Sequence, residues 1–352
     1  MSSEFVEVLP CSLCGEYGSP MPVAISYSGQ YVYAEMPTTT YESSYDFYVS
    51  DSYGSNMGVM TTQASPWETV SAGDGPLFAI SGQTLFGSLN YSDSLQIYEP
   101  PVNSYYVDAI CSSSGQYVLS LLADPNTETM ATYLSNHSGN SPVQQVIDCD
   151  YIQSIALAGF GQNMVAFGPK YYSYQSEAND PFALYVSFDY GGSWANIVDK
   201  FPENMNCLYF AIANVDNIYA SSCQVRKSSG AYTNTQQVFV SNDMGENWAA
   251  CNLPLTDYNA IAVSSYDSNV VGVSSSTGIY MSYNSGESWS NVESTSDWER
   301  IDLDSNGDNV VAFKTTEQNA GVYVSIGSSR RQLASSAAVV GKVLNVKKSH
   351  QA

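Results

Sequence analysis

Short runs of aliphatic and aromatic residues recur along the chain, and a tight-turn sequence precedes each of them. Residues 28–33 read Ser-Gly-Gln-Tyr-Val-Tyr, and residues 114–119 read Ser-Gly-Gln-Tyr-Val-Leu. Runs of this length and composition, bounded by Gly, Asn, Asp and Ser, predict β-strands. Segments of this kind occur at 28–33, 81–86, 114–119, 160–167, 215–220, 267–273 and 306–313.

A second pattern, in which an aromatic residue, an apolar residue and Ser follow one another, recurs between these runs. Its copies are Tyr48-Val49-Ser50, Tyr133-Leu134-Ser135, Tyr185-Val186-Ser187, Phe239-Val240-Ser241, Tyr280-Met281-Ser282 and Tyr323-Val324-Ser325, with Ile97-Tyr98-Glu99 as a degenerate copy. The spacing of about 46 residues is typical of one propeller blade. The sequence therefore predicts an all-β fold, a seven-bladed β-propeller of four-stranded antiparallel blades that fills residues 1–328 as a single domain.

The last repeat contains three strand-like runs, and the sequence after them, IGSSRRQLASS at 326–336, is a poor fourth strand. Residues 4–10, Glu-Phe-Val-Glu-Val-Leu-Pro, form a strand-like run with no partner of their own. A closed ring cannot leave an open sheet edge at this joint. We therefore expect the N-terminal strand to complete the seventh blade.

Three of the predicted hairpins carry a further motif, with Ser, an acid or amide, Gly and Trp at fixed spacing. Its positions are Ser187, Asp189, Gly191 and Trp194; Ser241, Asp243, Gly245 and Trp248; and Ser282, Asn284, Gly286 and Trp289. Weaker copies begin at Ser50 and Ser135. The motif resembles the Asp-box, or BNR, repeat of propellers of the sialidase, sortilin and photosystem II assembly factor type, and its copies extend over most of residues 20–328.

The residue types of this motif explain why it recurs. Ser and Asp oxygens can accept hydrogen bonds from the backbone N–H groups of a turn. Gly adopts a positive φ at little cost, and a Trp ring can be buried between neighbouring blades. In propellers with the Asp-box repeat, which this motif resembles, the motif lies away from the ligand-binding face. We therefore interpret these residues as structural and not as an active site.

The chain carries 11 Lys and Arg against 34 Asp and Glu, which gives a net charge of −23. Residues 329–352 contain five cations and no acid, and we expect them to form a basic C-terminal tail that is either flexible or a docking segment, including one for self-association. The acidic body would repel nucleic acid and anionic lipid, and no apolar run is long enough to span a bilayer. A basic protein partner suits this charge better.

The seven Cys do not define a compartment. The N-terminus lacks the basic and apolar regions of a signal peptide, so we expect an intracellular protein, although two glycosylation sequons at Asn90 and Asn136 leave an extracellular site open. Cys11 and Cys14 have CxxC spacing without a second pair or a matching His, and we expect two ordinary thiols. Cys207 and Cys223 lie at equal distance from a predicted hairpin turn and could form a disulfide.

In a propeller the loops between strands two and three, and between strand four and the next blade, share one face. We call this side the loop face. Its predicted loops are rich in Tyr and acids, which suit stacking on a sugar ring or contact with a basic protein partner. The candidate binding residues are Tyr105, Tyr106, Asp148, Asp150, Tyr171, Tyr172, Tyr174, Asp257, Tyr258, Trp298 and Glu299.

An enzyme is harder to support from these residues. Sialidases, which carry the Asp-box repeat that this motif resembles, hold their substrate with three Arg. Before the tail this chain has only Arg226 and Arg300. A glycoside hydrolase or lectin that uses a carboxylate pair remains the alternative, because 34 acids offer many pairs. The sequence predicts no cofactor and no metal, and favours a non-catalytic binding or assembly scaffold.

Overall fold

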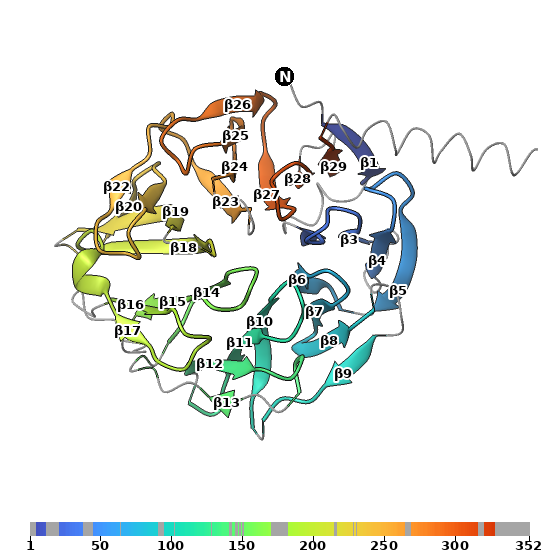
Figure 1. Ribbon diagram of the computed structural model, residues 1–352, viewed down its shortest axis with the longest axis horizontal. Coiled ribbons are helices and arrows are strands. Elements are labelled where there is room, and N and C mark those ends of the chain that lie inside the picture. The colour runs from blue at the N-terminus through green and yellow to red at the C-terminus, as the bar shows by residue number, and fades with distance from the viewer. Residues whose placement is uncertain are drawn as a thin grey trace, which may run out of the picture.

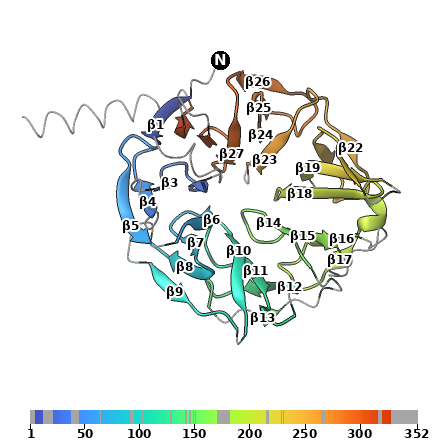
Figure 2. The ribbon, with the colours of Figure 1, turned by 180° about the vertical axis from the view of Figure 1, so that it is seen from behind.

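The computed structural model describes residues 5–11, 21–37, 45–63, 65–90, 95–101, 103–127, 129–140, 143–144, 147, 149, 151–169, 182–214, 217–227, 229, 231–264, 269–315 and 320–327. Within these ranges the strands form seven antiparallel sheets arranged as blades around a central axis (Figure 1). The chain is therefore a seven-bladed β-propeller, as the repeat spacing predicted. Figure 2 shows the same ring from the opposite face.

Blades one to four follow one another in chain order, with the first strand of each nearest the axis (Figure 1). Their strands are β2 (Val23–Ile25), β3 (Val32–Pro37), β4 (Tyr45–Ser50) and β5 (Gly58–Gln63); β6 (Trp67–Ala72), β7 (Leu77–Ser81), β8 (Thr84–Ser88) and β9 (Gln96–Tyr98); β10 (Tyr105–Cys111), β11 (Val118–Ala123), β12 (Met130–Ser135) and β13 (Val143–Gln144); and β14 (Ser154–Leu157), β15 (Met164–Pro169), β16 (Phe182–Ser187) and β17 (Ala195–Asn196).

Blades five to seven complete the ring, after a short 3-10 helix, η1 (Val198–Lys200), that follows β17. Their strands are β18 (Met205–Ile212), β19 (Ile218–Arg226), β20 (Tyr232–Asn234), β21 (Phe239–Ser241) and β22 (Ala249–Ala250); β23 (Tyr258–Val263), β24 (Val271–Ser275), β25 (Gly278–Ser282) and β26 (Ser290–Glu293); and β27 (Trp298–Leu303), β28 (Val310–Lys314), β29 (Gly321–Ser325) and β1 (Val6–Pro10).

The N-terminal strand closes the ring. Strand β1 pairs antiparallel with β29, with Val6 opposite Val324 and Pro10 opposite Gly321. In Figure 1 the blue β1 lies beside the dark red β29, so the two ends of the ordered ring meet in one blade. The prediction that residues from the N-terminus complete the seventh blade is confirmed.

The hydrophobic core is divided into seven clusters, one between each pair of neighbouring blades. The joint between blades one and two, for example, packs Tyr33 and Phe47 against Trp67 and Leu77, all of which are almost fully buried. Fully burying one such side chain contributes about 1.5–3 kcal/mol. Because each of these clusters joins two neighbouring blades, much of the stability of the ring comes from these successive interfaces.

The hairpins at 187–194, 241–248 and 282–289, which we call the box turns, share one hydrogen-bond pattern. In the second of them the Ser241 Oγ accepts the Gly245 N–H at 2.7 Å and donates to Asp243 Oδ1 at 2.8 Å. Asp243 Oδ1 also accepts the Asn247 N–H at 2.8 Å. Trp248 Nε1 donates to the Gly245 carbonyl at 3.1 Å, and its ring packs on the cluster between blades four and five.

The other two box turns place equivalent atoms in the same roles. The Gly N–H donates to the Ser187 or Ser282 hydroxyl at 2.9 Å in both. The residue before each Gly has a positive φ, 60° at Tyr190 and 56° at Ser285, so each turn contains two consecutive left-handed residues. A single buried Ser hydroxyl thus satisfies the turn backbone and fixes the hairpin.

Blade five has one strand more than the sequence predicted. Four strands were predicted for each blade, but β20, a fifth strand in this sheet, pairs with the end of β19, with Tyr232 opposite Arg226. The sequence of β20, Tyr-Thr-Asn, contains no apolar run of the kind that signals a strand, and all three residues are exposed. Its pairing comes from the hairpin geometry, which a search for buried runs does not detect.

Two findings concern the cysteines. Cys207 and Cys223 are register partners on β18 and β19 and form a disulfide with an S–S distance of 2.06 Å. Cys11 is also disulfide-bonded, so the expectation of an ordinary thiol at this position is wrong. The expectation treated the CxxC spacing only as a metal or redox motif, whereas two Cys three positions apart can also cross-link. Cys14 lies outside the described residues.

Candidate functional site

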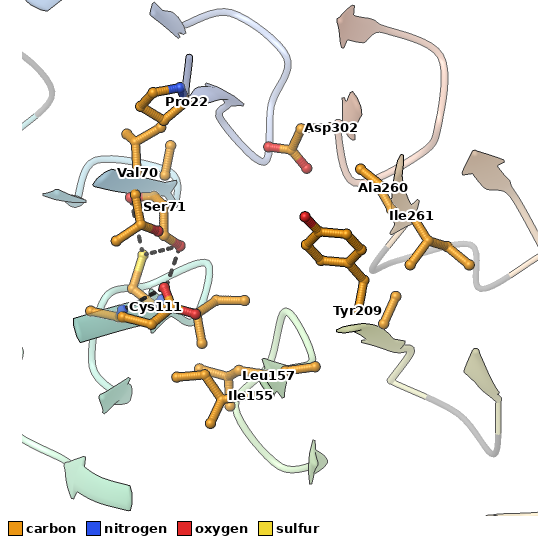
Figure 3. Close-up of a pocket in the computed structure, with 18 of the residues that line it drawn as sticks. Pro22, Val70, Ser71, Cys111, Ile155, Leu157, Tyr209, Ala260, Ile261 and Asp302 are labelled. Atoms are coloured by element: carbon orange, nitrogen blue, oxygen red, sulfur yellow. Dashed lines mark hydrogen bonds between the residues drawn. The ribbon is translucent and has the colours of Figure 1, made fainter. Parts of the chain in front are cut away.

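A cavity of about 510 Å³ lies on the axis of the ring. The first strand of every blade contributes to its wall, from β2 to β27 (Figure 1). Figure 3 shows the Tyr209 ring and the Asp302 carboxylate pointing into the open centre from β18 and β27. We call this space the central cavity, and its end at the starts of these strands opens on the loop face.

Four of the lining strands begin in the same way. A large buried aromatic residue, Trp67, Tyr106, Tyr258 or Trp298, stands first or second in the strand and pairs with the second strand of its blade. A register shift follows directly after it in each case. Such a β-bulge bends the strand and changes the direction of the next side chains.

This arrangement corrects three of the predicted binding residues. Tyr106, Tyr258 and Trp298 were expected on exposed loops, but each lies within the first two residues of a strand and has an exposed fraction of 2% or less. Their rings pack between blades; Trp298, for example, contacts Phe5 and Tyr323 with ring centroids at 5.7 and 5.1 Å. An aromatic residue next to polar ones was taken for a loop, because the bulge interrupts the alternation that identifies a strand.

The residue two positions after each buried aromatic lines the central cavity, and here the blades differ. The four blades place Thr69, Asp108, Ala260 and Arg300 at this point. One carboxylate and one guanidinium therefore enter the cavity from structurally equivalent positions. The bulge directs these side chains inward, whereas the aromatic residue before it anchors the strand.

Arg300 is held by an aromatic side chain from across the cavity. Its Nη1 donates to the Tyr209 hydroxyl at 3.0 Å, and its guanidinium carbon lies 5.6 Å from the centre of the Tyr209 ring. A cation over an aromatic face is attracted by the negative charge of that face. The positive charge of Arg300 also lowers the pKa of Asp108, while burial, the larger effect, raises it above its ordinary value.

Asp302 bridges blades seven and one. Its Oδ2 accepts the Ile25 N–H at 2.9 Å, and its Oδ1 accepts the Leu303 N–H at 2.9 Å. Burial nevertheless raises the pKa of this carboxyl to about 7, with a smaller contribution from the negative charge of Asp304. The Asp302 carboxyl is therefore more readily protonated than an exposed Asp.

Other polar side chains along the wall also link neighbouring blades. The Ser71 Oγ accepts the Cys111 N–H at 3.0 Å (Figure 3), Gln153 Nε2 donates to the Cys207 carbonyl at 3.2 Å, and Asn259 Nδ2 donates to the Trp298 carbonyl at 2.9 Å. These bonds pair backbone groups that the inner strand edge would leave unsatisfied. Burial raises the pKa of the Cys111 thiol to about 11, which makes it a poor nucleophile.

The remaining predicted site residues have mixed outcomes. Asp257 is exposed and its Oδ1 accepts from Asn234 Nδ2 at 2.6 Å, while Tyr105 and Glu299 are partly buried at the starts of β10 and β27. Burial raises the pKa of Glu299 above its ordinary value. The predicted residues outside the described ranges are Asp148, Asp150, Tyr171, Tyr172 and Tyr174.

Sequence reasoning missed the cavity residues Glu68, Asp108, Tyr209 and Asp302. All of them lie within the first strands, where the search for loop residues did not extend. For Asp108 the signal that could have found it is its place two positions after the buried Tyr106, whereas Glu68, Tyr209 and Asp302 do not stand two positions after a buried Trp or Tyr. Among the described residues, no group of three or more His, Cys, Asp and Glu could hold a metal ion.

Within the same ranges, no helix is long and apolar enough to cross a bilayer. No protein-family model matches the chain, and no curated protein sequence matches it. Solved structures do match in fold, at sequence identities that establish the fold alone.

Three of these solved structures are propellers that cover nearly the whole chain. YCF48 bound to D1 peptide matches with a TM-score of 0.60 and 11% identity, over 93% of this chain and 96% of that one. YCF48 from Cyanidioschyzon merolae matches with a TM-score of 0.57 and 10% identity, over 94% and 99%. Oligogalacturonate lyase from Vibrio parahaemolyticus matches with a TM-score of 0.65 and 8% identity, over 93% and 95%.

Proposed function

We propose that the protein is a non-catalytic binding or assembly module whose loop face takes a segment of a protein partner that carries Lys or Arg. The observation that supports this proposal is the charge of the central cavity. Its described charged lining residues are the carboxylates of Glu68, Asp108 and Asp302 and the single guanidinium of Arg300. A cationic side chain entering from the loop face would favour the ionised form of these carboxyl groups and would be attracted to them.

The bonding of these carboxylates favours binding over catalysis. Asp302 uses both oxygens to accept backbone N–H groups, and Asp108 accepts the N–H of Ala109 at 2.8 Å. Groups held in this way stabilise the inner strands and offer charge without leaving their positions. Glu68 is exposed, so it is the carboxylate most accessible to a ligand in the cavity.

The fold comparison adds a second argument. One of the similar rings is YCF48 with a D1 peptide bound, so a ring of this shape can hold a peptide. The resemblance of the box turns to the Asp-box repeat, in which the motif lies away from the ligand face, likewise favours the loop face. The charge of the central cavity is the feature that indicates a cationic partner, so the number of Lys and Arg residues is the property to vary in the partner.

Binding is tested with an array of peptides that differ in their number of Lys and Arg residues. The proposal predicts that the full-length protein selects peptides with several cations, and that raising the salt concentration to about 0.5 M weakens binding strongly, because the Debye length shortens. An array in which neutral and acidic peptides bind as well as basic ones, or none binds, would contradict it.

A carbohydrate-active enzyme is the second candidate, and one observation favours it. Asp108 and Asp302 both line the central cavity and both have raised pKa values. A carboxyl that stays protonated near neutral pH can act as a general acid on a glycosidic bond. Release of reducing ends or unsaturated products from a panel of polysaccharides, polygalacturonate among them, would support this function and replace the first.

A further inference from the structure

A second cavity, of about 350 Å³, lies where blade seven meets blade one. Val6 and Val8 of β1 and the neighbouring Val324 and Ile326 provide its apolar side chains, and the turn at 53–55 of blade one forms its other wall. We call this cavity the rim groove. It is separate from the central cavity, which none of these residues lines.

The sequence of blade one differs from the box turns at the joint where the rim groove lies. In the box turns a Trp follows the Ser by seven positions, and its ring packs on the cluster between its own blade and the preceding one. In blade one the turn begins at Ser50, and Met57 stands at the Trp position. Met57 also packs on the cluster between blades seven and one, but a thioether fills less space than an indole.

The turn itself is built like the others, so the space is not a distortion. The Ser50 Oγ accepts the Gly54 N–H at 3.0 Å, and Gly54 has a φ of 80°. A side chain at position 54 would stand 2.9 Å from Val324 and 3.4 Å from Val8. Blades seven and one are therefore in close contact at Gly54, which lies in the wall of the groove.

Strand β1 leaves an edge beside the groove. It is the outermost strand of blade seven, and no described strand pairs with its other side. Val6 has an exposed fraction of 54%, although the neighbouring Val324 is buried. An exposed apolar side chain on an unpaired strand edge is a site where another extended segment can add.

The chain itself supplies such a segment at this place. Ile326 lines the groove, and Gly327, the last described residue, donates its N–H to Asn309 Oδ1 at 3.3 Å. Residues 328–352 continue from there and lie outside the described residues. Within them, residues 337–346 read Ala-Ala-Val-Val-Gly-Lys-Val-Leu-Asn-Val, an apolar run with a single charge.

We propose that residues 337–346 dock into the rim groove of their own ring, beside β1. The nine residues between Gly327 and Ala337 could extend over about 30 Å, which is enough to leave the groove and return to it. A segment joined by so short a linker has an effective concentration in the millimolar range, which favours the same chain over a second copy.

Charge supports the same occupant. The docking run is flanked and interrupted by cations, Lys342, Lys347 and Lys348, whereas the remainder of the chain is strongly acidic and Glu7 lies in the groove wall. The cations can stay at the rim while the Val and Leu side chains take the groove. Such an arrangement would cover the blade joint that has Met57 where the three box turns have a Trp.

Hydrogen–deuterium exchange of the full-length protein tests the proposal. The backbone amides of 337–346 should exchange at least about tenfold more slowly than those of an unstructured chain. Val6→Lys should abolish this protection, because it places a charge in the groove. Val59→Lys is the matched control: Val59 is 53% exposed on the outer strand β5, and its substitution should leave the protection unchanged.

Val340→Asp, a change within the docking run that removes no contact of the ring, should abolish protection as Val6→Lys does. Thermal unfolding of each variant shows whether the ring is intact. Exchange at 337–346 as fast as in an unstructured chain, or equal loss of protection in Val59→Lys, would overturn the proposal. Protection that disappears on dilution by about 50-fold would also overturn it and indicate a second copy as the occupant.

Discussion

At the box-turn end of the ring, blades four, five and six place the same atoms in the same roles, whereas at the loop end equivalent positions hold different chemistry. The hydroxyls of Ser187, Ser241 and Ser282 each accept a Gly N–H within 2.7–2.9 Å. The positions after the strand-start bulges instead hold Thr69, Asp108, Ala260 and Arg300. The repeated residues lie in hairpins that stabilise the fold. The residues that differ between blades line the cavity, where they could select a ligand.

If this contrast is right, substitutions in the box turns should lower the stability of the protein. Some native residues at the loop end should themselves be destabilising. Glu35 is the clearest example of the second kind. It lies at the joint of blades one and two with an exposed fraction of 0%, and its Oε2 accepts the Trp67 N–H at 2.8 Å. Its Oε1 is buried and has no hydrogen-bond partner.

The largest expected effect is therefore on the pH dependence of stability. Burial raises the pKa of Glu35 from 4.5 to about 8, so between these values the folded protein binds a proton that the unfolded chain does not. The free energy of unfolding should fall as pH rises through this window, by up to about 4 kcal/mol from this group. Glu35→Gln should remove the decline, so that the variant is more stable than the native protein at pH 9.

Chemical denaturation of both proteins from pH 5 to pH 9 measures this effect, and their difference isolates Glu35 from other titrating groups. Parallel curves for the two proteins would mean that the Glu35 carboxyl titrates as it does in the unfolded chain. The same result would contradict the expectation that the buried Glu35 carboxyl destabilises the folded protein at high pH.

The next effect concerns two Gly residues that serve the same role in different surroundings. Gly245 has a φ of 88° and Gly286 a φ of 84°, so a substitution by Ala strains both. A Cβ at position 245 would also overlap the Cδ1 atom of Ile197, whereas at position 286 the nearest atom is 3.5 Å away. Gly245→Ala should cost about 2–3 kcal/mol and Gly286→Ala about 1 kcal/mol.

Thermal or denaturant unfolding of the two variants provides the measurement, each acting as the control of the other. Equal losses would show that backbone strain alone governs the box turns. A loss larger at Gly286 than at Gly245 would contradict the close contact between Gly245 and Ile197.

The repeats also explain which parts of the molecule the sequence could predict. Blade number, closure by the N-terminal strand and the partnership of Cys207 with Cys223 follow from spacing, because period and symmetry about a turn are visible along the chain. Strand β20 has no buried side chain, so it leaves no such signal. The predicted loop residues Tyr106, Tyr258 and Trp298 proved to be buried strand starts, since a bulge breaks the alternation there.

The cavity residues are a different case, because their proximity depends on the whole ring. Arg300 and Tyr209 are 91 positions apart and meet only when blades five and seven face each other across the axis. A single sequence gives no register between such strands. The recurrence of a buried aromatic before a cavity residue is a pattern that could be searched for in other propellers.

The most direct test of the central claim compares the same charge change at the two ends of the ring. Glu68 is exposed in the central cavity, and Glu287 is exposed in the third box turn. For the strongest basic peptide from the array, Glu68→Gln should raise the dissociation constant about tenfold at low salt, and Glu287→Gln should leave it unchanged. Equal changes in the two variants, or a larger one for Glu287→Gln, would contradict a binding site at the loop end.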